Sequence, residues 1–179
     1  MVARVMIALL ALVAVACYNA GRHGYDRTYV PLRDERPHLE RAETGVYNDV
    51  RHSPDRYDGT LLSWFGTVQR VEPGPGTKSK IYLSFRTHQE RHLCAEPERD
   101  SCRVTVSQAS SGPFIAMVQL RSEDRVGQNR VGVNSLLRLY CVTTAVFDDE
   151  GGPILDCEYY RHWPRGQWVH TGMRSEMRR

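Results

Sequence analysis

The chain has 179 residues, of which 41% are hydrophobic and 25% are charged. This balance is typical of a globular protein and excludes both a largely disordered chain and a membrane protein with several spans. The 24 basic residues are nearly matched by 21 acidic ones, and no run of five like charges occurs. Composition therefore gives no support for nucleic-acid binding, and the length fits one domain with flanking segments.

Residues 1–16 have the pattern of an export signal. Arg4 gives a short basic start, and residues 6–16 then run without a charged or strongly polar side chain. This apolar run is too short to cross a bilayer, which takes about 20 residues. We therefore predict a signal peptide over residues 1–16 that is removed from the mature protein.

The end of this segment resembles a lipobox, the signal for acylation of a cysteine that becomes the new N-terminus. Ala14, Val15 and Ala16 are followed directly by Cys17, with no polar stretch between the apolar run and the cysteine. We expect Cys17 to carry lipid, which would attach the protein to a membrane. Small residues at 14 and 16 also fit ordinary signal peptidase cleavage, and this alternative stays open. Tyr18, rather than an aspartate, follows Cys17, which favours the outer membrane of a bacterial envelope with the domain facing the periplasm.

The following stretch is polar and has no sustained apolar periodicity, so residues 17–45 are predicted to be the lipidated cysteine and a flexible tether. A short helix is expected to begin at Ser53-Pro54 and to end by Gly59. We assign residues 46–170 to one domain and residues 171–179 to a polar C-terminal tail.

From Thr60 onward the pattern indicates β-strands. Apolar residues occupy both faces of the first strand, within which Gly66 predicts a bulge or bend. The polar stretch 121–132 is expected to be a loop. The fold class that follows is all-β, a small OB-like barrel of five to six strands, which closes edges that would otherwise aggregate. The expected strands lie at 61–71, 81–86, 104–106, 114–120, 135–147 and 154–161.

The cysteine count supports both the lipid and an oxidising compartment. Five cysteines are present, and if Cys17 is acylated, four remain to form two disulfides. Four free buried thiols are the alternative. The four are Cys94, Cys102, Cys141 and Cys157.

Hairpin geometry favours one pairing of these cysteines. A hairpin centred on Asp149 places Cys141 opposite Cys157, where a disulfide can form. Cys94 and Cys102 bracket a polar loop and would form the second bridge. The same register pairs two further sets of residues, Leu139 with Tyr159 and Thr143 with Leu155.

Several short motifs resemble one known family. The segment 48–72 contains Asn48-Asp-Val50, Pro54, Tyr57-Asp-Gly59, Trp64-Phe-Gly66-Thr-Val68 and Glu72, and is similar to the opening of the starvation-inducible outer-membrane lipoprotein (Slp) family. Gly112-Pro-Phe114 and Tyr159-Tyr-Arg-His-Trp-Pro164 resemble later strands of that family. The resemblance implies a lipid-anchored envelope protein with an OB-like barrel. It implies no defined chemistry.

Aromatic and basic residues could form a ligand face on the barrel. OB folds stack bases or sugars on such faces, and the compartment favours a glycan over nucleic acid. The alternative, which we favour, is that most of these rings fill the core. The candidate face comprises Trp64, Tyr82, Arg86, Tyr159, His162 and Trp163.

No residue is assigned a catalytic or metal-binding role. His88 and His92 suggest a zinc-protease motif, but Gln89 stands where the general base should follow the first histidine. We expect a solvated loop there, with no metal and no cofactor. No Gly-x-Ser-x-Gly motif, Cys-x-x-Cys motif or phosphate loop is present.

The leading hypothesis is thus a non-enzymatic envelope lipoprotein whose disulfide-stabilised domain contacts other envelope components. The first alternative is a periplasmic ligand-binding module for a glycan or another polymer. The second is an exported hydrolase or metal-binding protein. A concave pocket holding His88, His92 or His162 beside a carboxylate would favour that last alternative.

Overall fold

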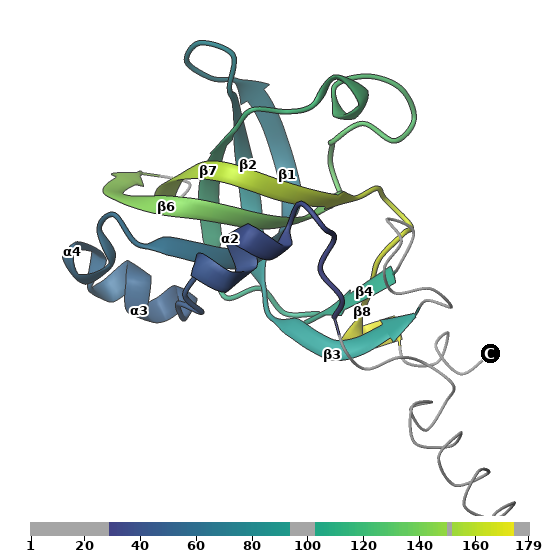
Figure 1. Ribbon diagram of the computed structural model, residues 1–179, viewed down its shortest axis with the longest axis horizontal. Coiled ribbons are helices and arrows are strands. Elements are labelled where there is room, and N and C mark those ends of the chain that lie inside the picture. The colour runs from purple at the N-terminus through teal and green to yellow at the C-terminus, as the bar shows by residue number, and fades with distance from the viewer. Residues whose placement is uncertain (1–28, 94–102, 150–151, 174–179) are drawn as a thin grey trace, which may run out of the picture.

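The computed structural model describes residues 29–93, 103–149 and 152–173, and its strands form a closed five-stranded barrel with a small three-stranded sheet beside it (Figure 1). The all-β, OB-like prediction is confirmed. None of the helices in these described ranges is long and apolar enough to cross a membrane.

The barrel strands follow the order β1-β2-β5-β7-β6, and β6 pairs back onto β1. All pairs are antiparallel except β5 with β7. Because β7 lies between β5 and β6 in the barrel, the connection from β5 to β6 has to cross over β7. The five strands are β1 (Leu61–Pro73), β2 (Ser79–Arg86), β5 (Pro113–Val118), β6 (Leu136–Asp148) and β7 (Gly152–Trp163).

Strand β1 is buried on both faces, as its sequence predicts. Trp64 and Val68 point into the barrel and join the main core, whereas Phe65 points outward into a second cluster. Gly66 also points inward, where a Cβ atom would lie 2.7 Å from the Phe114 ring. A bulge does not lie at Gly66 itself, because the register of β1 is continuous there and shifts between Val68 and Arg70.

The second cluster lies between the barrel and the small sheet. This sheet consists of β3 (His88–Leu93), β4 (Arg103–Val106) and β8 (Val169–His170) in the order β3-β4-β8. The loop predicted around His88 and His92 is therefore wrong, since both residues belong to a strand. The cluster consists of Phe65, Val104, Val106, Leu136 and Trp163, with Tyr29 and Trp168 packed against it.

The segment before β1 is not a free tether over its described part. Residues 29–45 pack on the outside of the barrel, and Glu35 is completely buried there. Three short helices follow one another before β1, and α2 lies beside β6 in Figure 1. The third of these helices begins at Pro54, which confirms the predicted helix start. They are α2 (Arg36–Arg41), α3 (Tyr47–His52) and α4 (Pro54–Tyr57).

The β6–β7 hairpin carries the predicted disulfide between Cys141 and Cys157. Thr143 pairs with Leu155 as expected. Leu139, however, pairs with Tyr160 rather than Tyr159, because the register shifts between Tyr140 and Cys141. The predicted bridge between Cys94 and Cys102, and the predicted lipid site at Cys17, lie outside the described residues.

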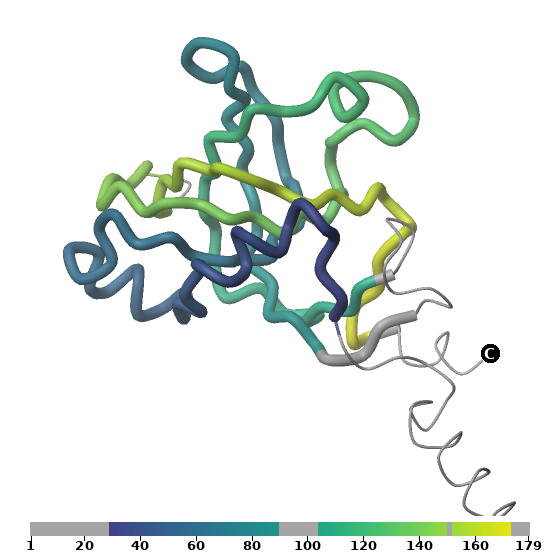
Figure 2. Tube along the Cα trace, viewed as in Figure 1, coloured from purple at the N-terminus to yellow at the C-terminus, as the bar shows by residue number. Residues whose placement is uncertain are grey.

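The connection between β5 and β6 closes one end of the barrel. It forms the long loop at the upper right of Figure 2 and contains one turn of 3₁₀ helix, Ser122–Asp124. Leu120 and Val131 from this connection are buried in the main core. The loop prediction is confirmed, and burial of these two side chains explains why the connection is ordered.

Candidate functional site

The connection between β5 and β6 contributes two residues that hydrogen-bond to the same histidine of β7. His162 Nδ1 lies 2.7 Å from Asp124 Oδ1, and His162 Nε2 lies 3.0 Å from Ser135 Oγ. This is the acid–base–nucleophile order of serine hydrolases. It is the constellation in the described residues that most resembles a catalytic site.

The partners determine the histidine tautomer. Because Asp124 can only accept when ionised, Nδ1–H donates to it. In the neutral imidazole, Nε2 then accepts from the Ser135 hydroxyl. Ser135 Oγ also accepts from the backbone N–H of Gly132 at 3.1 Å. Both ring nitrogens of His162 and the hydroxyl of Ser135 therefore have hydrogen-bond partners.

Asp124 is held on its second oxygen by a tyrosine. The Tyr160 hydroxyl donates to Asp124 Oδ2 at 2.5 Å, and the same hydroxyl accepts from the backbone N–H of Arg121. Burial alone would raise the pKa of Asp124, but the hydrogen bonds from His162 and Tyr160 outweigh it and hold the pKa below its usual value. Burial raises the pKa of Tyr160, so this residue remains a donor.

The site is closed to substrate in this conformation. Ser135 is 2% exposed, and the side chain of His162 is 5% exposed. The backbone N–H of Ser135 already donates to the Gly132 carbonyl, so it does not form an oxyanion hole. These hydrogen bonds fasten the connection to β7. We call Asp124, Ser135, Tyr160 and His162 the Asp124 clamp.

A second buried carboxylate fastens the N-terminal segment. Both Tyr29 and Tyr140 donate to Glu35 Oε1, at 2.5 Å and 2.6 Å. Arg138 and Arg161 each place a guanidinium nitrogen 3.4 Å from a Glu35 oxygen. We call these five residues the Glu35 cluster.

Strand alternation explains this cluster. On β6, Leu137 and Leu139 face the main core, so Arg138 and Tyr140 face outward under the N-terminal segment. The Arg138 guanidinium lies 4.3 Å from the centre of the Tyr29 ring and donates to Ser63 Oγ. Burial and the neighbouring carboxylate raise the pKa of Tyr29 and Tyr140, which keeps both as donors.

The six residues predicted to form a ligand face do not share one exposed surface. Trp64 is 2% exposed in the main core, and Trp163 is fully buried in the second cluster. The Arg70 guanidinium lies 3.8 Å from the centre of the Tyr82 ring. Tyr159 stacks on the ring of His38, which belongs to α2. Arg86 donates to Thr67 and Gln108, and His162 belongs to the Asp124 clamp.

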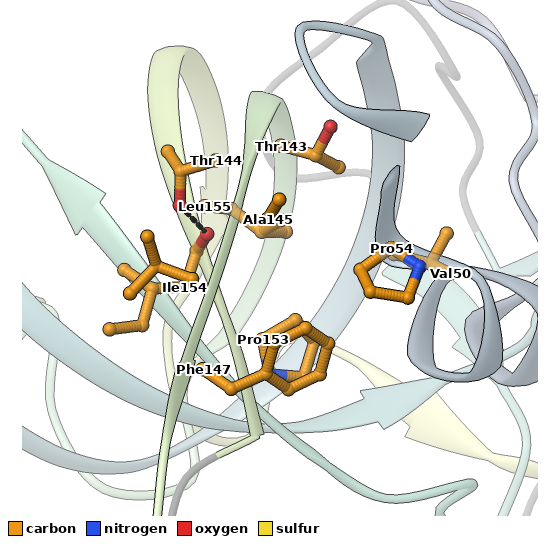
Figure 3. Close-up of a pocket in the computed structure, with 10 residues that line it drawn as sticks. Val50, Pro54, Thr143, Thr144, Ala145, Phe147, Pro153, Ile154 and Leu155 are labelled. Atoms are coloured by element: carbon orange, nitrogen blue, oxygen red, sulfur yellow. Dashed lines mark hydrogen bonds between the residues drawn. The ribbon is translucent and has the colours of Figure 1, made fainter. Parts of the chain in front are cut away.

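One small groove lies at the opposite end of the barrel, between helices α3 and α4 and the β6–β7 hairpin (Figure 3). Its empty space is about 200 Å³, counting space open to solvent. Val50, Pro54 and Phe147 are among its lining residues. The hairpin bulges here, with Ala145 at φ 49° and Val146 53% exposed.

Metal binding finds no support in the part of the chain that is described. His88 stacks on the Phe65 ring at 5.0 Å between ring centres. In the described ranges, no group of three histidine, cysteine or acidic side chains could hold a metal ion.

Sequence reasoning identified His162 but missed its two partners. Asp124 and Ser135 lie in a connection whose sequence has no repeating pattern, and they are 38 and 27 positions from His162. No motif spans such separations, so only the fold brings them together. Comparison with family models, with curated proteins and with solved structures finds no match to this chain.

Proposed function

We propose that this chain is a bacterial cell-envelope lipoprotein, anchored through acylated Cys17, whose barrel contacts other envelope components and has no catalytic role. The observation that carries the proposal is the uncharged run 6–16 that ends directly at Cys17. The disulfide between Cys141 and Cys157 supports it, because disulfides persist in oxidising compartments such as the periplasm.

The packing of the N-terminal segment supports an anchoring role. Twelve positions separate Cys17 from Tyr29, a span of at most about 43 Å. From Tyr29 onward the chain is fixed on the barrel through the Glu35 cluster. A lipid on Cys17 would therefore hold the barrel close to the membrane surface.

One observation favours a second candidate, an exported hydrolase. The Asp124 clamp has the order and distances of a catalytic triad. Because Ser135 is covered, this candidate requires the clamp to open, and the Discussion gives a direct test of the serine.

The first experiment is the intact mass of protein expressed in a Gram-negative host and recovered from membranes, with and without reduction. We expect a chain that begins at Cys17 with the added mass of about three acyl chains, since that is the usual modification of bacterial lipoproteins. Reduction should add the mass of two protons for each disulfide.

A Cys17→Ser variant is the matched control and should leave the membrane fraction. An unacylated native chain that begins at Cys17 would overturn the anchor. The protein would then be a soluble periplasmic one, and the ligand-binding and hydrolase alternatives would gain weight.

A further inference from the structure

A basic surface with exposed apolar residues lies beside the Asp124 clamp. Val126 is 71% exposed and Val133 is 61% exposed, the two largest values among the exposed large hydrophobic residues described. Trp168 is half-buried and lies near Val133, since its Nε1–H donates to the carbonyl of the adjacent Asn134 at 2.9 Å. We call the set Arg125, Val126, Arg130, Val133, Arg165 and Trp168 the arginine–valine surface.

The charge of this surface is positive. Arg125, Arg130 and Arg165 are exposed, and Glu123 is the exposed carboxylate on the same connection. Asp124 does not add to the exposed negative charge because it is buried and lies near Arg121. Tryptophan and other apolar side chains beside basic residues are typical of protein surfaces that lie at a membrane–water interface.

The exposed valines are held in place by the residues beneath them. The Asp124 clamp fixes both ends of this stretch, and the backbone N–H of Val131 donates to the Asp124 carbonyl at 2.8 Å. Val131 itself is buried in the main core. Exposure of Val126 and Val133 is therefore a property of an ordered loop, and binding would require little loss of conformational entropy.

The chain from Cys17 reaches the barrel at the second cluster, where Trp168 also packs. Tyr29 contacts this cluster through Phe65 and Trp163. In Figure 2 the described chain begins below the end of β7, and the long loop lies above it at the upper right. With at most about 43 Å of chain between Cys17 and Tyr29, a lipid anchor would keep this surface within reach of the bilayer.

We propose that the arginine–valine surface binds anionic phospholipid headgroups of the membrane that holds the anchor. This inference rests on the proposed function, because the lipid on Cys17 supplies the proximity. Arginines would pair with lipid phosphates, while Val126, Val133 and Trp168 would enter the headgroup region. The barrel would then lie on the bilayer in one orientation, with the β6–β7 hairpin and its groove directed away from it.

Vesicle binding by the unacylated mature chain, residues 17–179 with Cys17→Ser, tests the surface without the anchor. Trp168 is a natural probe, because the other two tryptophans, Trp64 and Trp163, are buried. We expect its emission to shift to the blue with vesicles of phosphatidylcholine and phosphatidylglycerol in equal amounts. Brominated lipids should quench it. Phosphatidylcholine alone should give little binding.

Variants in the exposed side chains test the residues. We expect Arg125→Gln with Arg130→Gln to weaken binding about 25-fold, from roughly fivefold for each arginine near an anionic surface. Val126→Asp should also weaken binding, and added salt should reduce the affinity of the native chain. Val146→Asp, at the groove, is the matched control, because Val146 is also exposed but lies at the other end of the barrel.

The outcomes separate this inference from the anchor. Absence of binding to anionic vesicles, or equal effects of Val126→Asp and Val146→Asp, would overturn the arginine–valine surface even if Cys17 is acylated. Selective binding by the unacylated chain together with a native protein that carries no lipid would support the surface and overturn the anchor.

Discussion

Two buried carboxylates fasten two irregular segments to the same barrel, and they do so by different means. Glu35 is 0% exposed and is surrounded by two arginines and two tyrosines. Asp124 is 7% exposed and is held mainly by a histidine and a tyrosine. The N-terminal segment is thus fixed by full charges in a dry site, and the β5–β6 connection by a chain of hydrogen bonds.

This difference predicts how each segment comes loose. Removing a charge from the Glu35 cluster leaves two buried guanidinium groups without their counter-ion, which is costly. Replacing Asp124 in its clamp leaves hydroxyl and imidazole groups that have lost an acceptor, which costs less than leaving unpaired charges. A substitution that removes the charge of Glu35 should therefore lower the free energy of unfolding more than one that removes the charge of Asp124.

The largest expected effect is that of Glu35→Gln. The variant keeps the size of the side chain but leaves Arg138 and Arg161 uncompensated, so the free energy of unfolding should fall by about 3–5 kcal/mol. Denaturant unfolding followed by circular dichroism measures this loss. Glu40→Gln, on the exposed side of α2, is the matched control and should change stability by less than about 0.5 kcal/mol. A loss of stability in Glu35→Gln no larger than that in Glu40→Gln would show that the charge of Glu35 does not hold the N-terminal segment.

Asp124→Asn should have a smaller effect, about 1–3 kcal/mol at neutral pH. The pKa of Asp124 is lowered in the folded protein, so its ionised form stabilises the fold above the unfolded aspartate pKa near 4. This stabilisation is lost as the pH falls through the lowered value. Unfolding measured between neutral and acid pH should therefore show the difference between native protein and Asp124→Asn shrinking below about pH 4. A difference that stays constant down to strongly acid pH would contradict this account.

The smallest expected effect is that of a serine-directed fluorophosphonate on Ser135. Because the hydroxyl is 2% exposed, we expect no labelling of the folded protein, as measured by peptide mass spectrometry. A Ser135→Ala variant is the control for reaction at other serines. Labelling of Ser135 that is lost in His162→Gln would show an activated nucleophile, and the Asp124 clamp would then be a catalytic site that opens.

The parts of the fold that could be predicted are those set by near neighbours in sequence. Alternation in β2 and the turn-rich residues around Asp149 predicted the strand, the hairpin and the bridge between Cys141 and Cys157. The resemblance to the Slp family and the anchor at Cys17 stay predictions.

The two carboxylate clusters could not be predicted, because their members are far apart in sequence. Glu35 and Tyr140 are 105 positions apart, and polarity around Glu35 indicated a tether rather than a packed segment. Arg138 and Tyr140 alternate with core leucines on β6. An arginine between two core leucines is the pattern of a strand with a solvated outer face, so nothing in the sequence indicated the covering segment.

The order of the barrel strands has a consequence for biosynthesis. β1 needs β6 to pair its second edge, and β5 needs β7, so the barrel stays open until residues 154–156 of β7 have been made. A chain emerging from the ribosome therefore cannot close the barrel early, since its nucleus depends on contacts between distant segments. Such late closure keeps the nascent polypeptide extended, which is the state that a translocation channel accepts.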